Sequence, residues 1–397
     1  MGPAASGDGC PQLGWGGAPR VARALLCAAI ATACSEGTGP KPAGVTSLAA
    51  GYYHTCGLAS GGTAYCWGYN YYGELGDGST DSAALYIRAT PVAVASGLTF
   101  ASLTTGGNHT CGLTSVGAAY CWGNNFYGEV GDGSTTNGLT PVAVVGGLTF
   151  ASLTAGGNHT CGLTSGGAAC CWGYNLGGDL GDSSTIQRLT PVAVAGGLTF
   201  ASLTAGYFHT CGLTRGGAAY CWGYNYYGEL GDSSTANGLT PVAVAGGPSF
   251  ASLTAGYYHT CGLTRGGAAY CWGSNFYGEL GDSSTTQRLT PVAVAGGLTF
   301  ASLTAGYFHT CGVTRGGVGY CWGYNNYGDL GDGSTTQRLT PVAVAGGLTF
   351  ASLTAGRNHT CGLTSGGAAY CWGYNYYGEL GDSTTTDRSS PVRVIGF

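Results

Sequence analysis

The residues best equipped for chemistry are seven histidines, each of which stands in the segment His-Thr-Cys. In all seven copies a second cysteine follows the first after nine intervening residues. Imidazole and thiolate groups bind zinc, and a histidine beside a hydroxyl or thiol can activate a nucleophile. Zinc sites, however, usually pair cysteines about two to four residues apart, and no such pair recurs here. The spacing therefore favours structural disulfides over zinc.

Each cysteine pair has the spacing of opposed positions in a β-hairpin. If the hairpin turns at Gly61, Cys56 lies opposite Cys66, with Cα atoms about 4.5 Å apart and within disulfide range. Such bridges require an oxidising compartment. The expected disulfides are Cys56–Cys66, Cys111–Cys121, Cys161–Cys171, Cys211–Cys221, Cys261–Cys271, Cys311–Cys321 and Cys361–Cys371. Cys170 replaces the tyrosine of the sister copies, and we expect a free, partly buried thiol there.

Carboxylates form the second recurring group. Fourteen of the 18 acidic residues lie in Gly-(Glu/Asp)-(Leu/Val)-Gly-Asp, as Glu74 and Asp77 do. Such a pair could bind Ca²⁺ or act as the acid and base of a glycosidase. Sevenfold repetition argues against an active site, because catalysis needs one place whose surroundings separate the two pKa values. The Asp-x-Ser-Thr that follows is typical of turns, so a structural loop is favoured over calcium and over an enzyme.

The histidines offer no better catalytic site. No serine or cysteine occupies a nucleophile-elbow sequence, and every histidine recurs in an equivalent strand. On strand alternation His54 and Cys56 share one face, whereas Thr55 shares the other face with Trp67. A strand histidine between packed units is most simply a hydrogen-bonded core residue. We therefore expect no catalytic residue, no metal and no cofactor.

The elements that hold these residues repeat with a long period. The first spacing between His-Thr-Cys segments is 55 residues and every later one is 50. Within one unit, short β-prone runs bounded by Gly or Pro cover 201–206, 209–214, 218–222 and 241–245. A period of this size with four strands per unit is typical of propeller blades.

We expect an all-β, seven-bladed β-propeller of four-stranded repeats. The chain starts its repeats with the first strand of the unit and ends with the last, so pairing of the N- and C-terminal strands would close the ring and hide both sheet edges. An open solenoid is the competing architecture, but it would have atypical units as caps. Seven near-identical units favour a closed ring and a monomer.

Composition narrows the possible partners. Only 8% of the residues are charged, the net charge is −5, and the chain has a single lysine, Lys41. Nucleic-acid binders cluster lysine and arginine along a phosphate track, and no such cluster exists here. A nucleic-acid partner is therefore not expected.

The N-terminal segment has the pattern of an export signal. Arginines precede a short apolar run that is too short to span a bilayer and ends in small residues before Cys34. We expect residues 1–34 to be a leader, 35–44 a flexible linker and 45–397 the propeller. The small-small-Cys ending resembles a lipoprotein box, which would lipidate Cys34 and give the only membrane contact. Ordinary secretion is the alternative, so the protein is expected to be a cell-envelope lipoprotein or a secreted protein.

Aromatic loops are the best lead to a binding surface. A Tyr- or Phe-rich segment follows most Trp-Gly pairs, and tyrosine provides contact area at low entropic cost. Packing between blades is the alternative role for these rings. Residues 81–88 add an apolar insertion to one unit only, which could dock a partner. The expected contact residues are Tyr71, Tyr72, Leu85, Tyr86, Phe126, Tyr127, Tyr226, Tyr227, Phe276, Tyr277, Tyr376 and Tyr377.

The repeat resembles a known family. The unit His-Thr-Cys-Gly-Leu…Tyr-Cys-Trp-Gly-x-Asn-x-Tyr-Gly-Glu-Leu-Gly is similar to that of the regulator-of-chromosome-condensation repeats, with Gln replaced by Glu or Asp. The resemblance covers residues 45–397 and implies a seven-bladed propeller. It also suggests guanine-nucleotide exchange or, as in secreted bacterial propellers, β-lactamase inhibition. The Trp-containing segments of the family's ultraviolet-B photoreceptor are replaced here by Gly-Tyr-Tyr-His-Thr and Gly-Gly-Asn-His-Thr.

Together these patterns predict an exported, non-enzymatic propeller that binds a protein, or else a glycan, through one rim. The alternative is an exchange-factor or inhibitor activity that belongs to the family. Aromatic platforms repeating blade by blade would favour a glycan, whereas a surface centred on residues 81–88 would favour a protein.

Overall fold

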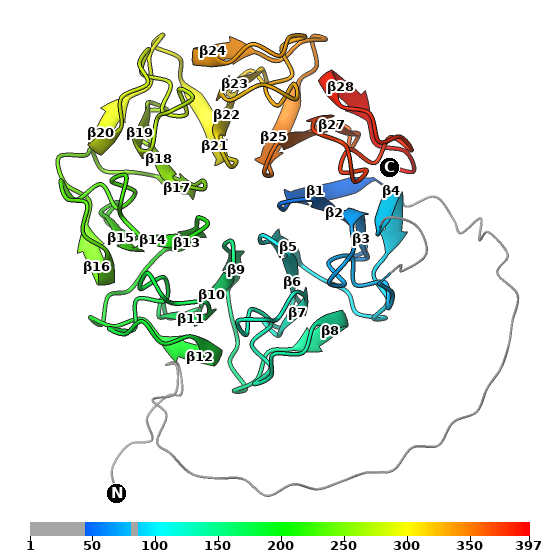
Figure 1. The fold of residues 1–397 in the computed structure, drawn as a ribbon, viewed down its shortest axis with the longest axis vertical. Coiled ribbons are helices and arrows are strands. Elements are labelled where there is room, and N and C mark those ends of the chain that lie inside the picture. The colour runs from blue at the N-terminus through cyan, green and yellow to red at the C-terminus, as the bar shows by residue number, and fades with distance from the viewer. Residues whose placement is uncertain (1–43, 81–85) are drawn as a thin grey trace, which may run out of the picture.

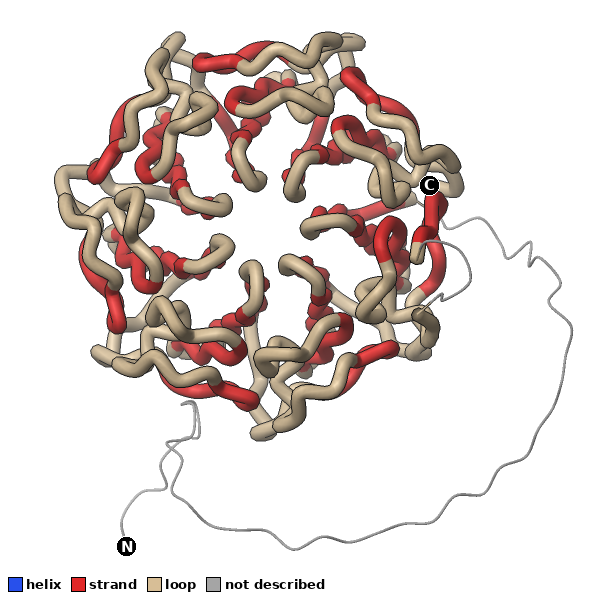
Figure 2. Tube along the Cα trace, viewed as in Figure 1, coloured by secondary structure: helices blue, strands red, loops and turns tan. Residues whose placement is uncertain are grey.

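Short runs of four to seven residues form 28 strands in the computed structural model, which describes residues 44–80 and 86–397. Figure 2 shows strands and loops but no helix in this part of the chain. The strands are β1 (Val45–Ala50), β2 (His54–Ala59), β3 (Ala64–Tyr69), β4 (Ile87–Ala93), β5 (Ser102–Thr105), β6 (His109–Leu113), β7 (Ala119–Gly123), β8 (Gly138–Ala143), β9 (Ser152–Ala155), β10 (His159–Leu163), β11 (Ala169–Gly173), β12 (Arg188–Ala193), β13 (Ser202–Ala205), β14 (His209–Leu213), β15 (Ala219–Gly223), β16 (Gly238–Ala243), β17 (Ser252–Ala255), β18 (His259–Leu263), β19 (Ala269–Gly273), β20 (Arg288–Ala293), β21 (Phe300–Ala305), β22 (His309–Thr314), β23 (Gly319–Gly323), β24 (Arg338–Ala343), β25 (Phe350–Ala355), β26 (His359–Thr364), β27 (Ala369–Gly373) and β28 (Arg388–Arg393).

The strands form seven separate four-stranded antiparallel sheets, each made of four consecutive strands. Blade 1 is thus β1–β4 and blade 7 is β25–β28. The sheets stand around a central axis with their first strands innermost and their fourth strands outermost (Figure 1). Residues at the ends of all seven first strands line a cavity on this axis, at the end that we call the mouth of the channel. The predicted seven-bladed propeller of four-stranded repeats is confirmed. Its fourth strand begins earlier than expected, at Gly238 instead of Pro241 in blade 4.

The cysteine register follows from the tight hairpin between the second and third strands. Cys56 pairs with Cys66 across β2 and β3, and their Cα atoms are 4.1 Å apart. The positive φ of Gly61 (102°) and Gly62 (85°) permits this short turn, which a residue with a Cβ would strain. All seven disulfides expected from the spacing are present.

Cys170 differs from its prediction. It is fully buried between blades and is disulfide-bonded, so the expectation of a free, partly buried thiol is wrong. Cys170 stands where the other blades have a half-buried tyrosine. Its sulfur packs in the hydrophobic cluster that contains Trp172.

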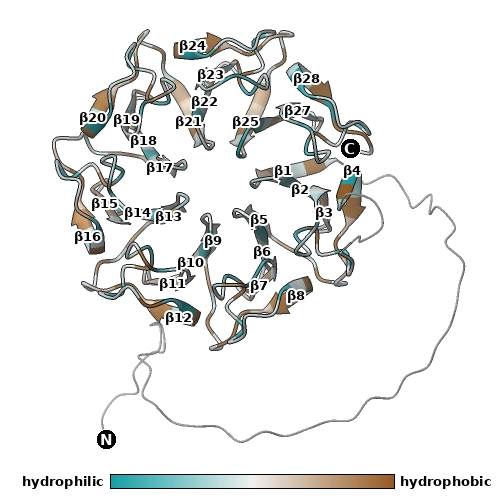
Figure 3. Ribbon diagram, in the orientation of Figure 1, coloured by the Kyte–Doolittle hydropathy of each residue, from teal (hydrophilic) through white to brown (hydrophobic). Residues whose placement is uncertain are grey.

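The hydrophobic core is divided among the junctions between blades. Each of seven clusters combines the disulfide and the loop leucine or valine of one blade with the tryptophan of the next. Six of them also contain a Leu-Ala pair, which Val313 and Gly319 replace in blade 6. In the cluster between blades 1 and 2, for example, Leu75 packs with Phe100 and Trp122. Figure 3 shows hydrophobic segments on the outer strands, where Pro-Val-Ala sequences cover these clusters from outside.

The ring closes differently from the prediction. β1 pairs with β2 and β28 pairs with β27, so the N- and C-terminal strands do not pair with each other. They cannot pair, because β1 is the innermost strand of its blade and β28 the outermost strand of the neighbouring one (Figure 1). Side chains join blade 7 to blade 1 instead: Phe397 packs on Trp67, as Phe100 packs on Trp122 at the next junction.

Residues 1–43 and 81–85 lie outside the described part of the chain. The predicted leader, Cys34, most of the linker and Leu85 fall there and stay predictions. Among the described residues no helix is long and apolar enough to cross a membrane.

Candidate functional site

The meander topology gives the ring two different faces. The loops between first and second strands (residues 51–53 in blade 1) and those between third and fourth strands (124–137 in blade 2) lie on one side, which we call the aromatic face. The tight hairpins between second and third strands (60–63) open on the other, which we call the hairpin face. The histidines and acidic residues belong to the first side, so all candidate chemistry lies toward the aromatic face.

The histidines connect neighbouring blades. His54 Nε2 lies 2.9 Å from Thr110 Oγ1 of the next blade. Thr110 Oγ1 donates to the backbone oxygen of Glu74 at 3.0 Å, and Trp122 Nε1 donates to the same oxygen at 2.9 Å. The His–Thr bond recurs at every junction, including the one between His359 and Thr55 that closes the ring.

This geometry fixes the protonation of the histidines. A threonine hydroxyl has one hydrogen, and it is already donated to a backbone oxygen, so the threonine must accept from a histidine Nε2–H. The seven Nδ1 atoms are buried and make no hydrogen bond. Burial lowers the pKa of His54 to about 3. The histidines are therefore neutral structural groups, as expected, and none reaches solvent.

The two carboxylates of each repeat have separate environments. Glu74 is fully buried, and its Oε2 accepts the backbone N–H of Tyr72 at 2.8 Å while its Oε1 has no partner. Burial raises its pKa to about 8, against the weaker effect of backbone hydrogen bonds. The equivalent acids of the other blades are raised in the same direction, to about 7 at Glu129, Asp179 and Glu279.

The aspartate three residues later organises a turn. Asp182 accepts the backbone N–H and the hydroxyl of Ser184, and its Oδ2 lies 2.7 Å from Arg188 Nη2. Burial alone would raise the pKa of Asp182, but hydrogen bonds from Ser184, Arg188 and Asn175 outweigh it and hold the pKa below its usual value. The oxygens that Ca²⁺ would need are thus engaged within the loop. No group of three or more His, Cys, Asp or Glu suited to a metal occurs within 44–80 and 86–397.

The predicted contact aromatics divide into two positions. Side chains at the first position are exposed, from 44% at Tyr71 to 67% at Phe126. The first position comprises Tyr71, Phe126, Leu176, Tyr226, Phe276, Asn326 and Tyr376, and the second comprises Tyr72, Tyr127, Gly177, Tyr227, Tyr277, Tyr327 and Tyr377. Rings at the second position are half-buried, and most of them pack on the next blade.

Two contacts illustrate this second position, and a third involves a ring of the first. Tyr227 lies 4.9 Å from Tyr258, and Tyr377 lies 5.1 Å from Tyr53, between ring centroids. Tyr86 is half-buried and packs edge-on against Tyr71 at 4.7 Å, which enlarges the exposed aromatic group of blade 1. The first position is thus available to a partner, whereas the second mainly supports the face.

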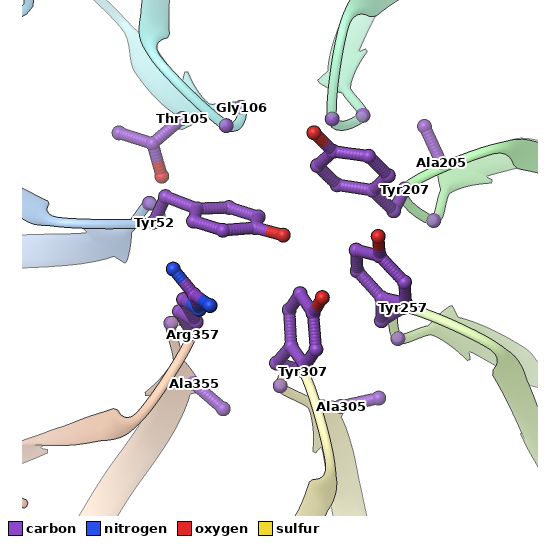
Figure 4. Close-up of a pocket in the computed structure, with 18 of the residues that line it drawn as sticks. Tyr52, Thr105, Gly106, Ala205, Tyr207, Tyr257, Ala305, Tyr307, Ala355 and Arg357 are labelled. Carbon is purple, nitrogen blue, oxygen red and sulfur yellow. The ribbon is translucent and has the colours of Figure 1, made fainter.

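A group that the sequence did not single out lies at the centre of the aromatic face. The residue after the first glycine of each Gly-x-x-His segment lies at the mouth of the channel. Four tyrosines and an arginine meet there around a cavity of about 110 Å³, and together they are the channel-mouth cluster (Figure 4). Its members are Tyr52, Tyr207, Tyr257, Tyr307 and Arg357.

The rings of the channel-mouth cluster contact one another from blade to blade. Centroid distances are 4.4 Å between Tyr207 and Tyr257, 3.7 Å between Tyr257 and Tyr307, and 5.4 Å between Tyr307 and Tyr52. Tyr207 leans over Gly157, where a Cβ would collide with its ring. Burial raises the pKa of Tyr52, and the neighbouring Tyr207 and Tyr307 raise it further.

Arg357 completes this group. Its guanidinium lies 5.0 Å from the ring centroids of Tyr52 and Tyr53 and 5.1 Å from that of Tyr307, within the range of cation–π attraction. The signal that could have revealed the group is variation at one position, which reads Tyr, Gly, Gly, Tyr, Tyr, Tyr and Arg along the chain, between a constant Gly and a nearby constant His.

Family comparisons agree with this architecture. The regulator of chromosome condensation (RCC1) repeat matches residues 45–74, 100–129 and 61–113. The RCC1-like domain matches residues 139–397, which is more than half of the chain. The chain belongs to the RCC1-like family.

Curated relatives of this RCC1-like protein match over short segments. It is 37% identical over 89 residues to the probable E3 ubiquitin-protein ligase HERC4 of Homo sapiens, which is 22% of this chain and 8% of that protein. It is 31% identical over 90 residues to the ultraviolet-B receptor UVR8 of Arabidopsis thaliana, or 23% of this chain and 20% of the receptor. The matched segments are thus a small part of both relatives.

Solved structures share the fold of this RCC1-like propeller. Prp20p of Saccharomyces cerevisiae, described with its binding to Gsp1p and histones, has a TM-score of 0.73 at 22% identity, covering 90% of this chain and 86% of that one. Human WBSCR16 has a TM-score of 0.75 at 19% identity, covering 84% and 93%. At these identities the likeness extends to the fold.

Proposed function

We propose that this RCC1-like propeller is an exported, non-enzymatic scaffold that binds a protein partner on its aromatic face. The observation that carries the proposal is the set of exposed hydrophobic rings at equivalent blade positions, including Phe126, Tyr226 and Tyr376, on one side of a rigid ring. Exposed aromatic side chains on a preorganised surface favour binding, because little conformational entropy is lost.

The buried groups support a role without catalysis. The seven His–Thr bonds and the seven acidic residues with raised pKa are enclosed between blades, where no substrate can reach them. A general acid or base must come within hydrogen-bond reach of the proton it transfers. The family fits the proposal, since solved RCC1-type propellers are described with bound proteins, as in yeast RCC1 (Prp20) with Kap60.

The disulfides support export. Seven buried bridges of the same geometry are compatible with folding in an oxidising compartment. Non-reducing mass spectrometry of the mature protein tests this part of the proposal. Intact bridges and a lipid on Cys34, or cleavage of the leader, would agree with it, whereas reduced thiols with residues 1–34 retained would contradict it.

Site-specific photocrosslinking tests partner binding. A photoreactive phenylalanine replaces Tyr226 or Phe276 on the aromatic face, and Val116 on the hairpin face serves as the control, since it is 77% exposed. In cells, we expect a discrete crosslinked protein from the first two positions and none from the control. Equal labelling from both faces, or none from the aromatic face, would contradict the proposal. A crosslinked small GTPase or β-lactamase would identify the exchange-factor or inhibitor alternative.

A glycan is the second candidate ligand, because the exposed aromatic position recurs from blade to blade. Sugar binding would use the exposed rings as stacking platforms. A glycan array compares the unchanged protein with a variant that replaces Phe126, Tyr226 and Tyr376 by alanine. A specific glycan bound by the former and lost by the latter would favour this candidate over a protein.

A further inference from the structure

Arg357 differs in its charge environment from the other arginines of the aromatic face. Among the described residues, five arginines there each pair with the turn aspartate of their own blade, at N–O distances from 2.7 to 3.7 Å. These are Arg88, Arg188, Arg288, Arg338 and Arg388. Arg357 makes no salt bridge in this part of the chain. It is a half-buried cation without a counter-ion at the centre of the face.

The contacts of Arg357 leave its hydrogen-bond donors available. Its guanidinium carbon lies about 5 Å from the centroids of three tyrosine rings, and its side chain donates to no described residue. A guanidinium has five N–H donors in its plane, arranged to bind a carboxylate with two parallel hydrogen bonds. These donors are therefore available to an anion that enters the cavity.

The tyrosines complete a site for a carboxylate on an apolar stem. The hydroxyl of Tyr52 points toward the other tyrosines of the cluster (Figure 4). The hydroxyls of Tyr52 and Tyr257 both hydrogen-bond to that of Tyr307, which accepts from them and keeps its own hydrogen for a ligand. The rings provide apolar walls for methylene groups. Tyrosine and arginine are also the residue types that dominate binding energy at interface centres.

The lining favours an acidic side chain over an acidic sugar. The cavity of about 110 Å³ is lined by Gly, Ala, Tyr, Thr105 and Arg357, with no carboxylate or carboxamide side chain. An acidic side chain needs only donors and apolar contact. A sugar also needs acceptors for its several hydroxyl groups, which here only hydroxyl and backbone oxygens of the lining could provide, and a polar group buried without a partner is costly.

We infer that the channel-mouth cluster is a carboxylate-binding site that receives an aspartate or glutamate side chain of a protein partner. Arg357 bonds the carboxylate, the Tyr307 hydroxyl supplies a further donor, and the rings of Tyr52 and Tyr307 pack on the methylenes. The inference rests on the proposed function, because the partner must dock on the aromatic face. The inference adds the chemical group, a carboxylate, that the centre of the aromatic face binds on the partner.

A titration with small probes tests the site without a partner. The full chain with ¹⁵N-labelled arginine is followed by NMR while N-acetyl-glutamate N-methylamide is added. Its uncharged analogue, N-acetyl-glutamine N-methylamide, is the matched probe. We expect the Arg357 Nε–H signal to shift saturably with the glutamate probe, and the glutamine probe to bind at least about tenfold more weakly, because charge-assisted hydrogen bonds are lost.

Variants separate the site from a general charge effect. Arg357→Gln is expected to weaken glutamate-probe binding by about tenfold or more, as read from the tyrosine ring signals. Arg215→Gln removes the same charge from the hairpin face and should leave the affinity unchanged. Tyr307→Phe keeps the ring, removes one donor, and is expected to weaken binding by a few-fold.

Three results would overturn the inference: equal binding of the two probes, unchanged binding by a folded Arg357→Gln variant, or a glucuronate titration at least tenfold tighter than that of the glutamate probe. The last would identify an acidic sugar as the ligand instead. None of them bears on the crosslinking result at Tyr226, so failure of this site and failure of the proposed function are distinguishable.

Discussion

The interior of the ring and the mouth of its channel use the same repeat in opposite ways. At the blade junctions the seven copies all make the same His–Thr contact, as with His109–Thr160 and His259–Thr310, both 2.9 Å. At the mouth, only two residues before each histidine in the chain, the copies differ, with glycine, tyrosine or arginine at equivalent positions. The contacts that recur in every repeat form the scaffold, whereas a position that varies between repeats forms a single asymmetric site at the channel mouth.

The largest expected difference between these regions is in pH dependence, which the interior alone should produce. Folding raises the pKa of the buried acids, to about 8 for Glu74, so the folded chain keeps protons that the unfolded chain releases above its pKa of 4.5. Stability from this source is full below pH 4.5 and is lost as pH rises toward 8. Folding lowers the pKa of His54 from 6.5 to about 3, so stability is lost as pH falls below 6.5.

The two linkages oppose each other between about pH 4.5 and 6.5, so thermal stability should be greatest there and decline on both sides. Calorimetry at pH 3.5, 5.5 and 8.5 measures this. Glu129→Gln, which cannot ionise, should lose less stability than the unchanged protein between pH 5.5 and 8.5. A melting temperature that rises steadily up to pH 8.5 would contradict the assignment of protonated buried acids.

The next largest effect is expected from removing a junction tryptophan. Trp272→Ala should lower the free energy of unfolding by about 3–5 kcal/mol, because it opens a cavity in a packed cluster and removes the bond from Nε1 to the Glu229 oxygen. Denaturant unfolding under oxidising conditions measures it. An equal loss in the free energy of unfolding for Tyr257→Ala at the channel mouth would contradict the contrast between the blade junctions and the mouth.

A smaller effect should distinguish two junctions. The Nε1 of Trp222 is buried without a hydrogen-bond partner, whereas that of Trp272 donates at 2.9 Å. Trp222→Phe should therefore cost about 1 kcal/mol less than Trp272→Phe, since only the second loses a hydrogen bond. Equal losses in unfolding experiments would mean that the two junctions are equivalent.

The smallest effect on stability is expected at the mouth. Arg357→Gln loses cation–π contacts with rings that remain packed on one another, so the free energy of unfolding should change by about 1 kcal/mol or less. Chemical denaturation beside the probe titration tests this. A larger loss of stability would make Arg357 a structural residue and remove the contrast between scaffold and site.

Local pattern was enough to predict most of the fold. The pairing of Cys56 with Cys66 follows from a hairpin whose turn and register lie within about a dozen residues. Strand alternation also separates His54 from Thr55, which lies opposite Trp67: the histidine faces blade 2 and the threonine faces blade 7. The prediction that β1 and β28 pair was wrong because β1 is the innermost strand of its blade and β28 the outermost strand of the neighbouring blade. The order of strands from the axis outward cannot be read from the pairing within one repeat.

The mouth could not be predicted for a related reason. Tyr52 and Arg357 are brought together by the closure of the whole ring, and their segments look like ordinary loop variation in a linear sequence. The carboxylate pairs show the same limit: spacing places Glu74 beside Asp77, but only the fold shows that one is enclosed between blades while the other organises a turn.

The chain passes directly from each blade to the next everywhere except between blade 7 and blade 1. That junction depends on non-covalent contacts, among them Thr55 with His359 and Trp67 with Glu379. Arg357 and Tyr52 lie on its two sides. A ligand that contacts both residues would therefore stabilise the junction between blades 7 and 1. It would raise the free energy of separating these two blades by RT ln(1 + [L]/Kd), where [L] is the ligand concentration. Binding at the site could then be measured as slower amide hydrogen exchange in the strands of this junction.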